Sequence, residues 1–476
     1  MRRTMPITKV LLVDTTLREG EQTPGVNFTI DEKLEIARAL DSIGVQMIEA
    51  GDPNVSDDVY QAVKLIAREG LSAEIIAHCR ANIKDVERAI SCDVDRVAIF
   101  LGVTDAKLKS MRLTEDEAIR RVVEAIEYAK SHGVKVRFTA EDGTRARYDF
   151  LVRICREAVR AGADRISLPD TVGIMTPWRI QAFFEKISRD VQGVEFDCHC
   201  HNDLGMAVAN ALAALEGGAT GVHVTVNGIG ERAGITSLET IAVALKVLYG
   251  IEVVKLDRLT WLSALVERLS GIVVPPHAPV VGENAFSHKG GVHIAAVLYD
   301  PSTYEAYPPE LVGRKREIVV SKYSGKHAVK ARLEALGIQL SDEDLEKVVN
   351  AIKSRHDVRT YRDADLIEVA EKVTGIKLTP EVPSRVEAII LVKCEPNVYT
   401  TSIARRIASM KEVTEVCEVS GDYDIQIRVS APTIADLNDC LERIRGIKGV
   451  SGTHTHFILK SLRPMQQSGQ QNLKSS

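Results

Sequence analysis

The sequence predicts an α/β protein that begins with a closed barrel of eight parallel strands and continues through helical accessory subdomains to a C-terminal α+β domain. Three observations predict this order. Short β-rich segments alternate with helical ones up to residue 226, helical sequence with Pro-rich joints replaces them from about residue 265, and a strand and helix pattern returns over 385–462. The chain has 476 residues, enough for a barrel of roughly 250 residues with additions.

The barrel is predicted from eight β-rich runs. They are residues 9–14, 45–50, 73–79, 95–101, 134–140, 164–168, 194–200 and 220–226. Intervening segments such as Thr29–Ile43 and Glu115–Ser131 carry apolar residues at helical spacing and charges on the opposite face, as helices that cover a parallel sheet do. Eight such units favour a (β/α)8 TIM barrel over an open doubly wound sheet, which is the structural alternative.

The remaining chain predicts two further regions and a tail. The accessory region has Pro-rich joints and charged helices, expected at 341–355 and 364–374, that could pack on a partner subunit. Strands expected at 386–392, 413–419, 423–430 and 450–459, with helices at 399–408 and 433–444, give a βαββαβ, ferredoxin-like order. We therefore expect a catalytic barrel at 1–270, accessory subdomains at 271–383, a C-terminal domain at 384–463 and a disordered Gln/Ser/Lys-rich tail at 464–476.

Composition argues against several classes of protein. The formal net charge is only -5, so no global field favours nucleic acid or an anionic membrane. The longest apolar stretches, such as Val97–Val103, are far shorter than the roughly 20 residues that a bilayer requires, and Met1–Thr8 lacks the apolar core of a signal peptide. The eight cysteines are scattered without CxxC spacing, which indicates reduced thiols. We expect a cytoplasmic protein.

The seventh predicted strand carries a candidate metal site. Asp197, His199 and His201 alternate, so they share the face that points into the barrel. Two imidazoles with an oxygen ligand suit a divalent first-row metal, although such a pair is also compatible with core histidines. His454 and His456 repeat the spacing without an acidic neighbour, and for them we favour a structural role.

Two other strands end in charged groups. Arg18 and Glu19 follow the first strand, where Glu19 is the natural oxygen ligand and a charged loop before a helix is the alternative. Arg137, Thr139 and Glu141 alternate along the fifth strand and should point inward together. An arginine inside a barrel needs an anion, which is either a ligand or a structural partner such as Glu141 or another core carboxylate.

Five motifs resemble the family that contains 2-isopropylmalate, citramalate and homocitrate synthases, in order and over roughly residues 9–380. They are DTTLREGEQTPG at 14–25, LPDTVG at 168–173, HCHND at 199–203, NGIGERAG at 227–234 and AFSHKGGVH at 285–293. The resemblance implies a condensation of acetyl-CoA with a 2-oxo acid. It also implies that Glu19, His199 and His201 bind a divalent metal, Mg²⁺, Mn²⁺ or Zn²⁺, which polarises the ketone.

The same resemblance implies catalytic roles outside the metal site. Arg18 would stabilise the developing negative oxygen, and Glu141, His293 and Tyr304 would manage the protons of the acetyl group and the later thioester hydrolysis, with the general base left open. By family analogy the segment with His293 and Tyr304 reaches the site of another subunit, so we expect a homodimer or a higher homo-oligomer. Gly228, Gly230 and Arg232 would contact the CoA arm.

Residues facing the far end of the substrate decide which 2-oxo acid fits. His78 and Arg137 match the charged recognition pair that the homocitrate branch places around the distal carboxylate of 2-oxoglutarate, with Thr139 and Thr171 as hydroxyl donors. Ile235 also follows that branch, whereas Leu204–Val208 is closer to the isopropylmalate branch. We predict 2-oxoglutarate and the first step of lysine biosynthesis. A 2-oxoisovalerate enzyme of leucine biosynthesis or one that accepts both acids is the alternative.

The C-terminal pattern, with GDYDI at 421–425, resembles the regulatory amino-acid-binding (RAM) module of leucine-responsive transcription regulators. It predicts feedback by an end product, lysine if the substrate is 2-oxoglutarate, with Asp422 and Tyr423 as candidate contacts; a mere assembly domain is the alternative. Asp197 is a rival lysine contact in the active site. Other functions considered are an acyl-CoA lyase and a catalytically silent amino-acid sensor, which the intact set of candidate residues disfavours.

Overall fold

The computed structural model describes residues 7, 9–354, 361, 363–376, 386–396 and 398–458, and the predicted tail at 464–476 lies outside them. The chain divides into two compact units, Met1–Leu378 and Thr379–Ser476. Within the described residues, no helix is both long and apolar enough to cross a membrane.

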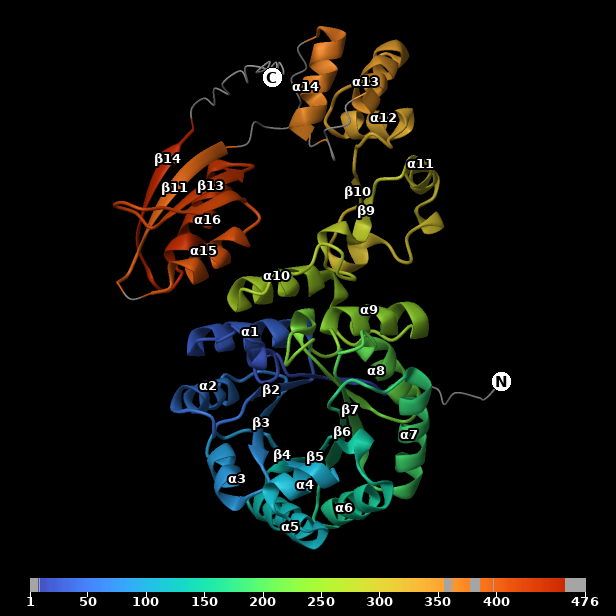
Figure 1. The fold of residues 1–476 in the computed structure, drawn as a ribbon, viewed down its shortest axis with the longest axis vertical. Coiled ribbons are helices and arrows are strands. Elements are labelled where there is room, and N and C mark those ends of the chain that lie inside the picture. Colours follow the sequence, from blue (N-terminus) through green and yellow to red (C-terminus); the bar gives the residue numbers. More distant parts are fainter. Residues whose placement is uncertain are drawn as a thin grey trace, which may run out of the picture. The chain divides into compact units, whose positions relative to one another are not determined.

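The first unit contains a closed barrel of eight parallel strands (Figure 1). They are β1 (Leu11–Asp14), β2 (Met47–Gly51), β3 (Glu74–Arg80), β4 (Arg96–Gly102), β5 (Lys135–Glu141), β6 (Arg165–Asp170), β7 (Glu195–Cys200) and β8 (Gly221–Val224). Parallel pairing of β1 with β8, from Leu11 opposite Gly221 to Asp14 opposite Val224, closes the ring. The predicted (β/α)8 barrel is confirmed, with strand ends that differ by a few residues.

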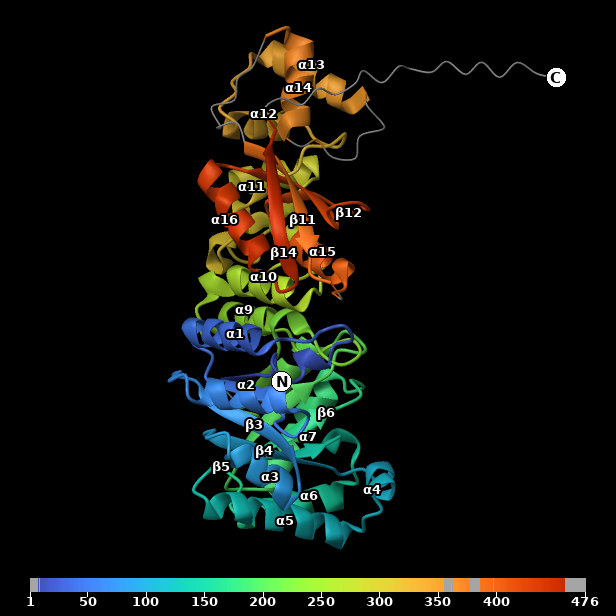
Figure 2. The same cartoon turned by 90° about the vertical axis from the view of Figure 1, so that its left-hand side faces the viewer.

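Helices surround the strands, as the views along and across the barrel show (Figures 1 and 2). They are α1 (Ile30–Ile43), α2 (Asp57–Ala67), α3 (Ile83–Ile90), α5 (Glu115–Ser131), α6 (Tyr148–Arg160), α7 (Pro177–Asp190) and α8 (Ala207–Glu216), while the short α4 (Asp105–Met111) lies at the end of the barrel after β4. Local sequence fixes their ends: Thr29 and Glu32 form a capping box at the start of α1, and Gly44 ends it with a left-handed φ of 91°.

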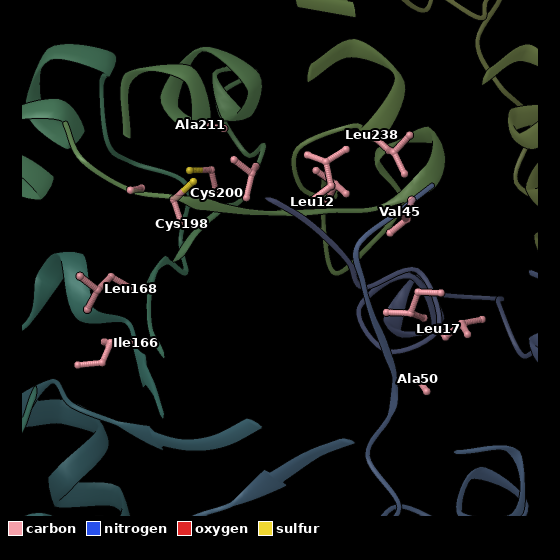
Figure 3. Packing of buried hydrophobic residues seen from close by; sticks show 14 of the residues in the cluster. Leu12, Leu17, Val45, Ala50, Ile166, Leu168, Cys198, Cys200, Ala211 and Leu238 are labelled. Atoms are coloured by element: carbon pink, nitrogen blue, oxygen red, sulfur yellow. The ribbon is translucent and has the colours of Figure 1, made fainter. Parts of the chain in front are cut away.

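The main hydrophobic core lies between the strands and these helices. Ile166, Leu168, Cys198 and Cys200 belong to this layer (Figure 3) and are at most 1% exposed. Because neighbouring side chains on a strand point to opposite faces, the polar residues that alternate with them point into the barrel. The eight cysteines are free, as expected.

After the barrel, the first unit continues as helices with two short strands. These elements are α9 (Leu238–Tyr249), α10 (Leu259–Ser270), β9 (Ser287–His288), α11 (Gly291–Tyr299), β10 (Glu317–Ile318), α12 (Lys326–Ala335), α13 (Asp342–Ser354) and α14 (Asp363–Thr374). The two charged helices expected near 341–355 and 364–374 are α13 and α14. Together with α12 they enclose a small apolar core of their own that includes Val329, Val348 and Leu366.

The second unit is a four-stranded antiparallel sheet with two helices. Its elements are β11 (Val386–Cys394), α15 (Thr400–Ala408), β12 (Val413–Glu418), β13 (Ile425–Ala431), α16 (Ile434–Arg445) and β14 (Val450–Phe457), and the strand order is β12-β13-β11-β14. Alternate residues of β11, including Ala388, Ile390 and Val392, are fully buried in its core. The predicted βαββαβ order is confirmed.

Candidate active site

A polar cavity of about 350 Å³ opens at the carboxyl ends of the barrel strands. The structure brings ten of the residues singled out from the sequence to its wall: Arg18, Glu19, His78, Arg137, Thr139, Glu141, Thr171, His199, His201 and Arg232. They come from β3, from β5, from the end of β7 and from the loops after β1, β6 and β8. The cavity is also lined by seven residues to which the sequence interpretation gave no individual role: Gln22, Phe100, Lys107, Ser167, Pro169, His223 and Glu231.

Glu19, His199 and His201 form a group that could hold a metal ion. One ligand atom from each lies within 4.8 Å of the others, and all three residues are buried. The two Nε2 atoms lie 3.3 Å apart, and Nε2 of His201 lies 4.0 Å from Oε1 of Glu19. Two nitrogens bound to one ion at about 2.1 Å would be separated by roughly 3 to 3.5 Å, so the spacing of the histidines fits.

The protonation of the histidines also suits a cation. Burial, reinforced by the neighbouring His201 and His223, holds the pKa of His199 well below its usual value of 6.5. Burial likewise lowers the pKa of His201. Both imidazoles are therefore neutral at pH 7 and each keeps a nitrogen lone pair, as a metal ligand must.

Two arginines flank the candidate metal ligands and share one carboxylate. Arg18 donates from Nη1 to Oε2 of Glu19 and from Nε to Oε1 of Glu49, both at 2.5 Å. Arg137, which is 1% exposed, is paired with the other oxygen of Glu49 and lies 3.1 Å from His223. The anion that Arg137 requires inside the barrel is thus Glu49 rather than Glu141.

His78 is neutral, which revises the interpretation of His78 and Arg137 as a charged pair. Its ring stacks on Phe100 with a centroid separation of 4.5 Å. Burial, aided by the positive charge of Arg18, lowers its pKa to about 3. His78 therefore adds no positive charge to that of Arg18 and Arg137, and it can contribute a hydrogen bond.

Three hydroxyl groups face the cavity from β5, β6 and the loop after β6. The hydroxyls of Thr139 and Ser167 have no hydrogen-bond partner among the described residues, although both are buried. Thr171 accepts a hydrogen bond from the backbone N–H of Asp142 at 3.0 Å. A buried hydroxyl without a hydrogen-bond partner destabilises the folded protein, so Thr139 and Ser167 are suited to hydrogen-bond a polar ligand.

Glu141 is paired with Lys107 of α4, whose Nζ lies 2.6 Å from its Oε1. His293 and Tyr304 do not line this cavity. They lie together in the accessory region, with ring centroids 4.2 Å apart. The structure therefore does not join His293 to Glu141 within the described part of one chain.

The glycine-rich loop after β8 packs directly against the candidate metal ligands. A Cβ atom on Gly230 would lie 3.2 Å from the Glu19 side chain. Gly234 has a φ of 80°, and a Cβ there would meet the carbonyl oxygen of Gly228 at 1.9 Å, so only glycine fits. Arg232 is held by Asp203 at 2.8 Å. The proposed contact of this loop with CoA stays a prediction.

The candidate effector residues are not among those that line the cavity. Asp197 is fully buried and accepts two hydrogen bonds from Arg165 on Oδ1. In the second unit, Asp422 and Tyr423 occupy the turn between β12 and β13, and the ring of Tyr423 lies 6.3 Å from that of His454. Their role in binding an amino acid stays a prediction.

Three family models match the chain in succession. The HMGL-like model matches residues 9–266, the homocitrate synthase post-HMGL domain-like model matches 280–360, and the Lrp/AsnC ligand binding domain model matches 387–467. These matches follow the barrel, the accessory region and the second unit.

Known proteins that are similar to the chain belong to the same families as these models. Homocitrate synthases of Sulfurisphaera tokodaii and Saccharolobus solfataricus are 56% and 53% identical to it over 459 residues, which is 95% of this chain and 100% of each relative. Solved structures of hydroxymethylglutaryl-CoA lyases from Bacillus subtilis and Pseudomonas aeruginosa share the barrel fold, with TM-scores of 0.52 and 0.51 and sequence identities of 21% and 23%. Each match covers 57% of this chain, and the two matches cover 97% and 96% of the respective lyase chains. Homocitrate synthases are metal-dependent condensing enzymes of the acyltransferase type, and the chain belongs to this branch of the HMGL-like family.

Proposed function

We propose that the protein is a homocitrate synthase, which condenses acetyl-CoA with 2-oxoglutarate and then hydrolyses the thioester. The observation that carries this proposal is Arg137, a buried cation on the wall of the cavity that also holds the candidate metal ligands. A substrate with a second carboxylate needs such a cation, because an unpaired buried carboxylate costs several kcal/mol. The similarity to named homocitrate synthases supports the same substrate.

Glu19, His199 and His201 would hold the divalent ion, Mg²⁺, Mn²⁺ or Zn²⁺. When bound, the ion acts as a Lewis acid toward the carboxylate and ketone of the 2-oxo acid. Arg18 lies beside Glu19 and would stabilise the negative charge that develops on the ketone oxygen. Arg137 would exchange part of its contact with Glu49 for the distal carboxylate, which the hydroxyl of Thr139 and the neutral His78 would orient.

The acetyl group needs a positioned base, because its methyl protons are weakly acidic. Glu141 lines the cavity, and Lys107 holds its carboxylate. We propose that His293 and Tyr304 enter from a second copy of the chain and complete the site. Gly228, Gly230 and Arg232 would receive the CoA arm beside it.

The test is the release of free CoA from acetyl-CoA with Mg²⁺ or Mn²⁺, compared among 2-oxoglutarate, 2-oxoisovalerate and pyruvate. We expect a preference for 2-oxoglutarate that Arg137→Ala abolishes. Arg96→Ala is the matched control, because Arg96 is a buried arginine of the barrel that pairs with Glu74 and does not line the cavity. A preference for 2-oxoisovalerate would instead identify a 2-isopropylmalate synthase.

We also propose that the second unit binds the end product, lysine, and so regulates the first step of lysine biosynthesis. Its match to the Lrp/AsnC ligand binding domain supports an amino-acid ligand. A chain ending at Pro383 should keep its CoA release and lose its inhibition by lysine. If lysine still inhibits the shortened chain, the effector site would instead lie in the barrel, where Asp197 is the candidate contact.

A further inference from the structure

His223 of β8 is a buried residue of the cavity that neither the motifs nor the proposed reaction uses. Its side chain is 1% exposed. Nδ1 lies 3.2 Å from Nδ1 of His199, and Nε2 lies 3.1 Å from Nη1 of Arg137. One nitrogen of His223 thus contacts His199, a proposed metal ligand, and the other contacts Arg137, the arginine proposed to bind the distal carboxylate of the substrate.

We propose that His223 is a positioning residue that orients His199 toward the metal ion, an inference that rests on the proposed function because the metal ligands come from it. A histidine that binds a metal through one nitrogen is held through the other, and this second contact fixes the tautomer and the direction of the ring. No other described residue is hydrogen-bonded to Nδ1 of His199. The ring planes of His199 and His223 cross at 89°, so the rings are not stacked face to face, and their Nδ1 atoms are the atoms that meet.

The direction of the hydrogen bonds shows how His223 would act. An arginine can only donate, so Nε2 of His223 accepts from Arg137, and a neutral His223 carries its proton on Nδ1. When His199 offers Nε2 to an ion, its own proton sits on Nδ1 and faces the same atom of His223. The proton of His223 must then move to Nε2.

Asp197 provides an acceptor for that proton. Its Oδ2 lies 3.8 Å from Nε2 of His223 and has no hydrogen-bond partner within the described ranges. Arg165 holds the other oxygen of Asp197, so the carboxylate stays in place. A small movement of the imidazole, away from Nη1 of Arg137 and toward Asp197, completes a chain of hydrogen bonds from Asp197 through His223 to His199, while Arg137 keeps its pairing with Glu49.

Two substitutions distinguish the roles of the two ring nitrogens of His223. The amide of an asparagine occupies roughly the place of Nδ1, whereas the amide of a glutamine reaches the place of Nε2. Titration of the metal-free full-length protein with Mn²⁺, followed by the electron paramagnetic resonance of free Mn²⁺, needs no substrate. We expect His223→Asn to keep an affinity close to that of the unsubstituted protein and His223→Gln to bind about 10- to 100-fold more weakly.

Val222→Ala is the matched control. Val222 is the neighbour of His223 on β8 and is fully buried in the outer apolar layer, so its truncation lowers the melting temperature without touching the site. Its Mn²⁺ affinity should not change. Equal weakening in His223→Asn and His223→Gln, or none in either, would overturn the proposal. The substrate panel on the unsubstituted protein tests the proposed function separately, since its result does not depend on His223.

Discussion

Glu49 is fully buried between Arg18 and Arg137 and contacts both guanidinium groups. Despite the cost of burial, these two positive charges hold its pKa well below the usual value of 4.5. We predict that Glu49→Gln lowers the free energy of unfolding by about 3 to 5 kcal/mol at pH 7, because it leaves two buried arginines without their shared anion. Denaturant unfolding measures the loss.

The same experiment has a defined pH dependence. A carboxyl whose pKa is lower in the folded protein stabilises it above the unfolded value near 4.5, and that contribution disappears as the pH falls toward the folded value. The difference between Glu49→Gln and the unsubstituted protein should therefore be full at pH 7 and shrink below about pH 4.5. Glu69→Gln, which breaks a surface pair with Arg38, is the control and should cost less than about 1 kcal/mol. A cost for Glu49→Gln no larger than this control would contradict the buried pairing.

Thr139→Val tests whether an unpaired hydroxyl serves the substrate. The hydroxyl of Thr139 has no hydrogen-bond partner in the part of the chain that the structure describes, so its removal should leave the melting temperature unchanged or slightly higher. If it donates to a carboxylate of 2-oxoglutarate, KM for that acid should rise about tenfold. In Thr225→Val, by contrast, the melting temperature should fall, because that hydroxyl donates to the carbonyl of Ile229 at 2.6 Å. An unchanged KM in Thr139→Val would remove Thr139 from the substrate site.

Sequence could predict inward-facing residues only where they form a pattern. Alternation along a strand gave the correct face for His199 and His201, and for Arg137 and Thr139. Glu49 and His223 are single polar residues in apolar strands, and Arg137, which both contact, lies 88 and 86 residues away from them. Those contacts exist only because the barrel closes, so a lone polar residue in a buried strand was the available signal.

At the scale of an element, the loop after β8 packs against the side chain of Glu19 and limits its position. We predict that Gly230→Ala weakens Mn²⁺ binding by about tenfold, because its Cβ would lie 3.2 Å from the carboxylate arm of Glu19 and displace it. A direct titration of the metal-free protein measures the change.

Gly143→Ala is the control for this substitution. Gly143 is also a buried glycine, at the start of the short 3-10 helix after β5, but a Cβ there meets the side chain of Leu168 at 3.4 Å. Mn²⁺ affinity should be unaffected. If Gly230→Ala binds Mn²⁺ as tightly as this control, Glu19 does not depend on the loop for its position.

Helices could be predicted where capping residues and the spacing of buried apolar residues indicate the same element. The helix over residues 115–131 was expected with the bounds that the structure has, since Thr114 and Glu117 form a capping box at its start. The accessory region has only short strands, β9 and β10, and none was expected from sequence. Two-residue pairings carry no periodicity, so their formation depends on tertiary contacts.

At the scale of the whole molecule, the proposed site is incomplete in one chain, because His293 and Tyr304 do not line the cavity that holds the metal ligands. If a second copy supplies them, His199→Ala and His293→Ala should each be inactive alone but complement each other. Mixed dimers isolated with two different affinity tags would contain one intact site of two, so we expect about half of the unsubstituted activity by CoA release. Mixed dimers of His199→Ala with Glu19→Gln, both altered in the barrel, should stay inactive. Absence of recovery in the first pair, with dimers confirmed by light scattering, would mean that each chain completes its own site through a movement of its accessory region.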